Sequence, residues 1–299
     1  MKNVIFKYSF IIAIAASLQA GSDIDATAAE EVVALDVVGQ RVVGTLETPE
    51  GDPAPVVLLL HGFTGTRDEL PVKDTDEGVF ARSARLLAEA GYASLRIDFR
   101  GSGESDGAWA DTTFSDQITD AVVAIDWLQS DPRVNGENIS VLGWSQGGLV
   151  ATHVAAARPD IKSLILWAPV TNPLSTFSGL LGADTIAAAV AGPADKEHTV
   201  KLPWGVETTL KGRFYYELAT TSPTGAVTAY PGPMLVIVGS RDTVVAPQPA
   251  AGQILLNYHE GPERLQVFDT DHVWDAFSGP ATLDEKMIPA TLDWLAATQ

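Results

Sequence analysis

The sequence Gly-Trp-Ser-Gln-Gly at positions 143–147 contains a residue type suited to nucleophilic catalysis, a serine flanked by glycines. It follows an apolar run at 139–142 and leads into residues 148–157, whose apolar positions recur at helical spacing. A serine on such a strand-to-helix turn adopts a strained backbone, and glycines two places before and after it let the strand and helix pass closely. The helix N-terminus adds partial positive charge beneath the reacting centre. We therefore predict that Ser145 is a nucleophile.

A serine hydroxyl needs a neighbouring base before it can attack, and histidine is the side chain suited to that task. His272 lies in a loop after the apolar run 264–268, where the end of a strand would present it at the same sheet edge as Ser145. We predict His272 as the base. The other four histidines have positions that favour an oxyanion loop, a helix interior, an inserted segment and a helix C-terminus, respectively: His61, His153, His198 and His259.

An acid must fix the tautomer of that histidine and stabilise its protonated form. Asp242 follows the apolar run 234–238 at another strand end. It completes the order serine, aspartate, histidine along the chain, which is one of the orders known for catalytic triads. Asp271 is the alternative, but side chains adjacent in sequence rarely face each other well enough for a hydrogen bond. We predict Asp242 as the acid.

Two backbone N–H groups are predicted to stabilise an oxyanion. One belongs to Gln146, at the start of the helix after the serine. The other belongs to Phe63, in the sequence His-Gly-Phe-Thr-Gly at 61–65 that follows the apolar run 56–60. The glycine before Phe63 permits a backbone turn that aims amides inward, although an ordinary tight turn would have the same composition.

A further sequence, Asp-Phe-Arg-Gly-Ser-Gly-Glu-Ser at 98–105, is similar to the Asp-x-x-Gly-x-Gly-x-Ser segment common in the α/β-hydrolase superfamily. With the serine, aspartate and histidine, it gives residues 55–299 a resemblance to that superfamily. The 61–65 and 144–148 sequences and a short cap after the sixth strand most resemble the cinnamoyl and feruloyl esterase-like branch, whose members often have another residue in place of Trp144. The resemblance implies an α/β-hydrolase fold and a Ser-His-Asp mechanism with no cofactor or metal.

The elements needed to hold these residues follow from the hydrophobic pattern. Residues 31–46 are rich in valine and broken by Gly-Gln, which predicts an opening hairpin. Six short apolar runs then alternate with helix-like stretches, which predicts an α/β fold with a mostly parallel central sheet flanked by helices. The runs are 56–60, 93–97, 139–142, 161–167, 234–238 and 265–268, and the amphipathic stretches are 80–90, 114–129, 148–157, 250–258 and 283–297.

Residues 171–231 interrupt the alternation, and this interval is too long for a simple loop. Segments 199–202 and 206–210 flank Pro-Trp-Gly as in a hairpin, which predicts a cap subdomain at about 172–230 inserted over the strand ends. Aromatic residues there are expected either in the core of the cap or on the wall of an acyl or aryl pocket. The residues predicted to line that pocket are Trp144, Trp204, Phe214 and Tyr215.

The composition excludes some classes of function. Nineteen Lys and Arg against thirty-eight Asp and Glu give a net charge of −19, which disfavours nucleic acid and anionic membrane surfaces as partners. The absence of cysteine excludes disulfides and a thiolate nucleophile. Lysines before an apolar run at 10–18, and small residues at 26–28, predict a signal peptide over 1–28 and export to the periplasm or medium, with no stable membrane insertion.

These inferences predict one catalytic domain, 29–299, that hydrolyses small-molecule carboxylic esters through an acyl-enzyme, with short-chain or aromatic (cinnamoyl or feruloyl-like) substrates. Two alternatives stay open. A prolyl oligopeptidase-like peptidase would use the same triad on peptides, although no propeller fits before residue 55. A non-catalytic binding protein of the same fold would typically lack one triad residue, and all three are present here.

Overall fold

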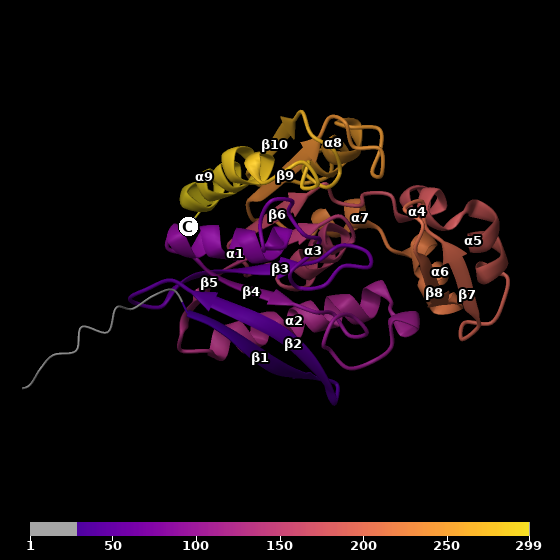
Figure 1. The fold of residues 1–299 in the computed structure, drawn as a ribbon, viewed down its shortest axis with the longest axis horizontal. Coiled ribbons are helices and arrows are strands. Elements are labelled where there is room, and N and C mark those ends of the chain that lie inside the picture. Colours follow the sequence, from indigo (N-terminus) through magenta and orange to yellow (C-terminus); the bar gives the residue numbers. More distant parts are fainter. Residues whose placement is uncertain (1–28, 299) are drawn as a thin grey trace, which may run out of the picture.

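The computed structural model describes residues 29–298, and the signal peptide predicted at 1–28 lies outside them. Within this range, eight strands form one sheet in the order β1-β2-β4-β3-β5-β6-β9-β10 (Figure 1). β2 runs antiparallel to both of its neighbours, and the other six strands of the sheet, β4, β3, β5, β6, β9 and β10, run parallel to one another. Their bounds are Ala29–Val37 (β1), Gln40–Thr48 (β2), Ala54–Leu60 (β3), Ala93–Ile97 (β4), Val134–Trp144 (β5), Ser163–Trp167 (β6), Met234–Gly239 (β9) and Glu263–Phe268 (β10).

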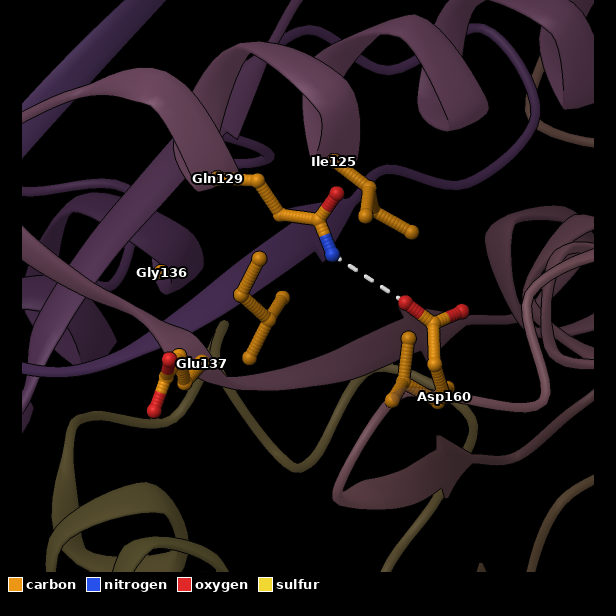
Figure 2. Close-up of a pocket in the computed structure, with 7 residues that line it drawn as sticks. Ile125, Gln129, Gly136, Glu137 and Asp160 are labelled. Carbon is orange, nitrogen blue, oxygen red and sulfur yellow. Dashed lines mark hydrogen bonds between the residues drawn. The ribbon is translucent and has the colours of Figure 1, made fainter.

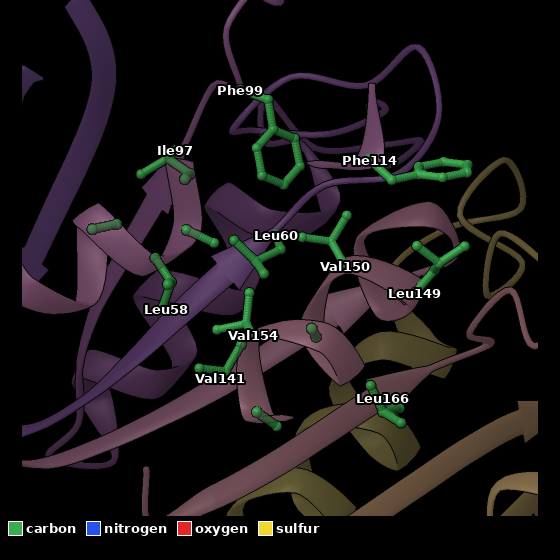
Figure 3. Close-up of a cluster of buried hydrophobic side chains, with 14 of the residues drawn as sticks. Leu58, Leu60, Ile97, Phe99, Phe114, Val141, Leu149, Val150, Val154 and Leu166 are labelled. Carbon is green, nitrogen blue, oxygen red and sulfur yellow. The ribbon is translucent and has the colours of Figure 1, made fainter. Parts of the chain in front are cut away.

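The central strands are apolar along their whole length because both faces of the sheet are covered. In β3, Leu58 and Leu60 pack into one cluster of buried side chains, whereas Val57 and Leu59 pack into a second cluster. Successive side chains of a strand point to opposite faces, so the two clusters lie on the two sides of the sheet. Figure 3 shows part of the first cluster, where side chains of β3 meet those of α3.

Helices complete the two layers. α2, α3 and α8 contribute to the first cluster, and α1 and α9 contribute to the second, in which α9 is entered through a π-helical turn. The predicted α/β fold with a mostly parallel sheet is confirmed, and the valine-rich opening segment forms the β1–β2 hairpin. The helix bounds are Val79–Glu89 (α1), Phe114–Ser130 (α2), Gln146–Ala157 (α3), Ala250–Leu256 (α8), Leu283–Met287 (the π-helical turn η2) and Ile288–Thr298 (α9), with a short 3-10 turn, η1, at Trp109–Asp111.

A largely helical insertion separates β6 from β9. Its hairpin, β7 (Glu197–Lys201) with β8 (Glu207–Lys211), matches the two segments that the sequence pairs around Pro-Trp-Gly. Figure 1 shows α4, α5 and α6 beside this hairpin, to one side of the main sheet, whereas α7 returns to pack on α3. The sequence pattern does not predict these helices, which span Pro173–Leu181 (α4), Ala183–Val190 (α5), Gly212–Thr220 (α6) and Pro223–Val227 (α7).

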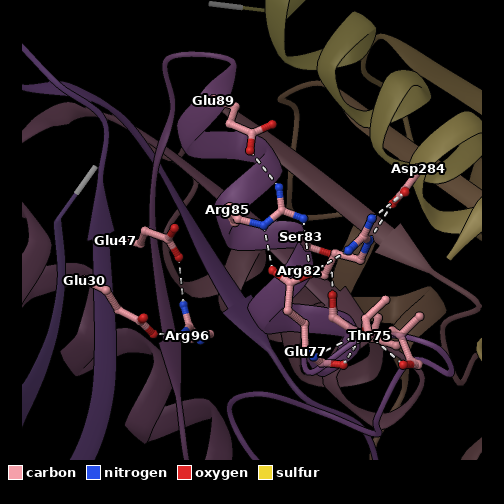
Figure 4. A network of polar contacts seen from close by, with 12 residues as sticks. Glu30, Glu47, Thr75, Glu77, Arg82, Ser83, Arg85, Glu89, Arg96 and Asp284 are labelled. Carbon is pink, nitrogen blue, oxygen red and sulfur yellow. Dashed lines mark hydrogen bonds and ion pairs between the residues drawn. The ribbon is translucent and has the colours of Figure 1, made fainter. Parts of the chain in front are cut away.

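An ion-pair network joins the start of α1 to the C-terminal helical segment (Figure 4). The Arg82 guanidinium donates to both carboxylate oxygens of Asp284, at 2.7 and 2.6 Å, and to Glu77 at 2.5 Å. The Arg82 side chain is only 14% exposed, so these charged groups meet in a partly desolvated setting. The network therefore holds together two segments that follow the loops at 61–65 and 269–275.

Replacing Arg82 by methionine tests this network. We expect Arg82→Met to lower the free energy of unfolding by about 1–3 kcal/mol, because two carboxylates lose a charge-assisted partner while the aliphatic stem is kept. Urea unfolding followed by circular dichroism measures the change. Arg85→Met is the matched control: Arg85 also pairs with Glu77 but is 38% exposed, and its loss should cost less than about 1 kcal/mol. Equal losses in both variants would contradict this account.

Candidate active site

Ser145 stands on the sharp turn between β5 and α3. Its backbone has φ 56° and ψ −115°, a left-handed region that side chains other than glycine rarely occupy. A Cβ atom on Gly143 would lie 2.2 Å from the Gly147 carbonyl oxygen, and one on Gly147 would lie 2.0 Å from the Leu60 carbonyl oxygen. The two glycines are therefore required where the turn passes over the end of β3, and this turn lifts the serine out of the strand.

A chain of hydrogen bonds connects Ser145 to His272 and Asp242. His272 Nε2 lies 3.0 Å from Ser145 Oγ, and His272 Nδ1 lies 2.7 Å from Asp242 Oδ2. A carboxylate only accepts, so Nδ1 carries the proton and Nε2 is left to accept the serine hydroxyl proton. This tautomer is the one that a general base needs. The structure thus brings together the three residues that the sequence singled out.

Asp242 is fixed by its own loop as well as by His272. Its side chain is fully buried, and its Oδ1 accepts from the N–H groups of Val244 and Val245 at 2.8 and 3.0 Å. The second oxygen is thereby turned toward the imidazole. Such backbone support orients a carboxylate without another charged group.

The Asp271 carboxylate has a different use. Its Oδ1 accepts from the N–H groups of Val273 and Asp275, at 3.0 and 2.8 Å, which closes the turn that carries His272. Between the two acids that the sequence offered, the geometry therefore pairs Asp242 with the imidazole and leaves Asp271 to shape the loop.

The two predicted oxyanion donors lie on either side of Ser145. Gln146 is the first residue of α3, where N–H groups have no partner within the helix. Phe63 lies in a turn closed by a hydrogen bond of 3.1 Å from the Gly65 N–H to the Gly62 carbonyl. Among the described residues, neither the Phe63 nor the Gln146 N–H has an acceptor. A Cβ on Gly62 would lie 3.5 Å from Ser145 Cβ, so this loop borders the serine directly.

The loop at 61–67 is anchored by groups that the sequence analysis did not assign. The buried Asp98 carboxylate accepts from the Arg67 N–H at 2.7 Å and forms an ion pair with the Arg67 side chain. His61 donates from Nδ1 to the Gly62 carbonyl, and its Nε2 accepts from the Phe99 N–H. Burial lowers the pKa of His61, which keeps its ring neutral near pH 7. The only sequence signal for this anchor was the similarity of 98–105 to a superfamily segment.

The aromatic residues of the insertion that were predicted to line a pocket are separated in the structure. Phe214 is buried on α6, and its ring centroid lies 6.1 Å from that of Phe63. Tyr215 is also buried, and burial raises the pKa of its phenol to about 12. Trp204 stands at the β7–β8 turn and is 52% exposed. Of these three, Phe214 alone has its ring against the oxyanion loop.

Trp144 lies in the core beneath the site instead of on a pocket wall. It precedes the serine on β5, so its side chain points to the face that α1 covers, where its ring packs near Phe80. Its indole N–H donates to the His272 carbonyl at 3.2 Å. Trp144 therefore supports the loop that carries the imidazole.

A cavity of about 330 Å³ adjoins the oxyanion loop, between the main domain and the β7–β8 hairpin. The Trp109 indole N–H donates to Thr208 Oγ1 at 2.8 Å across it, and the Trp109 ring lies 5.4 Å from that of Phe63. The cavity is large enough to hold a small substrate group. It is lined by Trp109 and residues 64–66, 101–103 and 206–209.

A second cavity of about 330 Å³ lies near the start of β5, at the end of the strand opposite to Ser145 (Figure 2). Its walls include Gly136 and Glu137 near the start of β5, and Gln129 donates to Asp160 beside it at 3.1 Å. Ser145 follows the other end of β5, so this cavity takes no part in the site.

Residues 29–298 contain no cluster of three or more His, Cys, Asp or Glu side chains arranged to hold a metal ion. In the same range, no helix is both long and apolar enough to cross a bilayer.

Known proteins share this architecture. The family model described as alpha/beta hydrolase fold matches residues 55–197. Est1E from Butyrivibrio proteoclasticus, solved with bound ferulic acid, is 26% identical, covers 88% of this chain and 99% of its own, and superposes with a TM-score of 0.70. The protein has the α/β-hydrolase fold. The chain resembles the feruloyl esterase branch of this fold, as its 61–65 and 144–148 sequences predict.

Curated proteins are also similar to this chain in sequence. A monoacylglycerol lipase of Mycolicibacterium smegmatis is 27% identical over 252 residues, which span 74% of this chain and 80% of the lipase. Other matches are shorter: an uncharacterized protein of Rickettsia prowazekii is 28% identical over 137 residues, and the match spans 46% of this chain and 54% of that protein. The chain thus spans about half the length of such relatives. Its similar proteins thus include a lipase and an esterase.

Substituting Gly147 tests the steric basis of the serine turn. We expect Gly147→Ala to destabilise the fold by about 3–5 kcal/mol, because the new methyl group would collide with backbone atoms of β3 that cannot move aside. Gly179→Ala, on an exposed position of α4 with open space around it, should change the free energy of unfolding by less than about 1 kcal/mol and in the stabilising direction. Urea unfolding compares the two, and a Gly147→Ala protein as stable as the parent would refute the clash.

Proposed function

We propose that this α/β-hydrolase is a serine carboxylic ester hydrolase that works through an acyl-enzyme. The observation that carries the proposal is the unbroken hydrogen-bond chain from Asp242 through His272 to Ser145, on a strained turn bordered by two N–H groups without acceptors. Each member of this chain lies within hydrogen-bond distance of the next, as its role requires.

In the proposed reaction, Ser145 Oγ attacks the ester carbonyl carbon while His272 Nε2 takes the hydroxyl proton. The carbonyl electron pair moves onto oxygen, and the Phe63 and Gln146 N–H groups stabilise the resulting oxyanion. The imidazolium then gives its proton to the departing alcohol oxygen, which leaves an ester on Ser145. Asp242 stabilises the imidazolium throughout.

Deacylation repeats these steps with water. His272 takes a proton from a water molecule, whose oxygen attacks the acyl carbon and forms a second oxyanion in the same place. Collapse of this intermediate returns the proton to Ser145 Oγ and releases the carboxylic acid. The same residues therefore serve both halves of the reaction, and no cofactor enters the proposed scheme.

Short-chain or aromatic esters are the proposed substrates. The cavity beside the oxyanion loop is small, and the ring of Trp109, which packs against Phe63, borders it, which suits a compact or aromatic group. The likeness to Est1E, which binds ferulic acid in its solved structure, supports the aromatic option for this chain.

A substrate panel tests the reaction class. We expect turnover of p-nitrophenyl acetate and butyrate and of methyl ferulate to exceed that of aminoacyl-p-nitroanilides, because an ester alcohol leaves more readily than an amine. Ser145→Ala should lose at least about 10⁴-fold in kcat on every ester turned over. Faster anilide than ester turnover would favour a peptidase, and unchanged activity in Ser145→Ala would refute the mechanism.

Two aspartate variants test the assignment of the acid. Asp242→Asn should lower kcat by roughly 10³–10⁴-fold, because the amide cannot stabilise the imidazolium and permits the wrong tautomer. Asp271→Asn removes a turn contact and should lower kcat by less than about tenfold. Steady-state kinetics with p-nitrophenyl acetate compares them, and a larger loss in Asp271→Asn than in Asp242→Asn would reassign the acid.

A further inference from the structure

Glu69 has the most unusual environment of any acidic residue near the site. Its carboxylate oxygen Oε1 accepts a hydrogen bond from the Gly62 N–H, and burial raises the pKa of this carboxyl to about 7. Among residues 29–298, no Lys, Arg or His side chain pairs with it. A buried carboxyl without a counter-charge is costly, so its presence beside the oxyanion loop requires an explanation.

The charged groups around Glu69 are already engaged with other partners. On the preceding residues, Arg67 pairs with Asp98 and Glu104, and Asp68 pairs with Arg96. His61, on the strand side of the loop, is neutral near pH 7, and the first turn of α1 carries no acidic residue. Within the described part of the chain, the ionised Glu69 carboxyl is stabilised by the backbone N–H groups of Gly62 and Leu70 alone.

The backbone of the oxyanion loop makes room for this carboxyl. The three atoms nearest to a Cβ built on Gly65 all belong to the Glu69 carboxyl, the closest being Oε1 at 2.7 Å. A Cβ built on Gly62 would lie between Glu69 Oε1, at 3.3 Å, and Ser145 Cβ, at 3.5 Å. One peptide layer therefore separates the carboxyl from the proposed nucleophile.

The main chain at position 69 adopts a conformation that is unfavourable for glutamate. Glu69 has φ 63°, a left-handed conformation in which glycine or asparagine is the favoured residue. Such a conformation costs on the order of 1–3 kcal/mol for other residues and persists where the surroundings hold it. A glutamate occupies it here with its carboxyl folded back onto the loop seven residues earlier.

From this geometry we infer that Glu69 is a positioning residue for the oxyanion loop, holding the Gly62–Phe63 backbone so that the Phe63 N–H faces the developing oxyanion. The inference rests on the proposed function in that it assumes attack by Ser145. If Glu69 has this role, loss of its contact weakens binding of the transition state and leaves binding of the ground-state substrate nearly unchanged.

Kinetics of three variants test the inference. Glu69→Ala should lower kcat on p-nitrophenyl acetate by about 10–100-fold with KM changed less than threefold, since removing an oxyanion donor outright costs roughly 10²–10³-fold. Glu69→Gln keeps an acceptor for the Gly62 N–H and should retain kcat within about fivefold. Asp68→Asn, the neighbouring acid that does not reach the loop, is the control and should remain within twofold. Equal losses in Glu69→Ala and Glu69→Gln, or none in either, would overturn the inference.

A tetrahedral inhibitor separates this inference from the proposed substrate class. 2,2,2-Trifluoroacetophenone forms a hemiketal oxyanion with an attacking serine, whatever ester or amide the enzyme prefers. Its Ki should rise in Glu69→Ala by the same factor as kcat falls, while Ser145→Ala should not bind it. An unchanged Ki in folded Glu69→Ala would overturn the positioning role, and binding retained by Ser145→Ala would instead refute the proposed mechanism.

Gly65→Ala provides an independent route to the same contact and guards against misfolding of Glu69→Ala. Its methyl group would push the Glu69 carboxyl off the Gly62 N–H, so we expect the same fall in kcat. In a Glu69→Ala background, the added Gly65→Ala should lower kcat by a clearly smaller factor than it does in the parent, because no carboxyl is left to displace. Fully additive losses in this cycle would contradict the inference.

The burial of the carboxyl has its own pH signature. The folded-state pKa of about 7 lies above the usual 4.5, so the unfolded chain releases this proton first, and the parent loses stability relative to Glu69→Gln as pH rises from 4.5 to 7. The Tm of Glu69→Gln minus that of the parent should therefore increase between pH 5 and pH 8. A constant difference would show that Glu69 is not the buried acid on which the inference depends.

Discussion

The close passage of the β5–α3 turn over the end of β3 is the constraint on which the rest of the site depends. At Gly143 and Gly147 the two backbones approach so closely that no Cβ atom fits, and Ser145 between them is forced to a positive φ. This conformation directs the serine hydroxyl away from the sheet and toward the loops at its carboxyl edge. It also places the start of α3, with its unpaired N–H groups, beside the same hydroxyl.

Backbone groups hold most of the remaining side chains of the site. Val244 and Val245 N–H groups turn Asp242 toward the imidazole, and Asp271 closes the turn beneath His272. On the other side of the serine, Asp98 anchors the loop at 61–67, and Glu69 contacts its inner surface. The site is therefore built from loops that are each fixed by a carboxylate accepting main-chain N–H groups. This arrangement suits a protein that has twice as many acidic as basic side chains.

The sequence predicts the sheet and the three central side chains because each of these residues follows a strongly apolar run. Parallel strands bring their carboxyl ends to one edge, so the positions of Ser145, Asp242 and His272 can be derived without coordinates. The role of Glu69 cannot be predicted in this way, because its contact depends on a left-handed backbone and on a hydrogen bond to Gly62, seven residues earlier. Aromatic identity likewise does not tell which side of a strand Trp144 faces, and α5 buries only Ile186 and Ala189, too few residues for a periodic signal.

The claim that Ser145 forms the covalent intermediate has a direct test in mass spectrometry. Treatment with one equivalent of a fluorophosphonate, followed by intact-mass measurement and peptide mapping, should show a single adduct located on Ser145 and complete loss of ester hydrolysis in proportion to labelling. An adduct on another residue, or hydrolysis that continues after Ser145 is fully modified, would contradict the account.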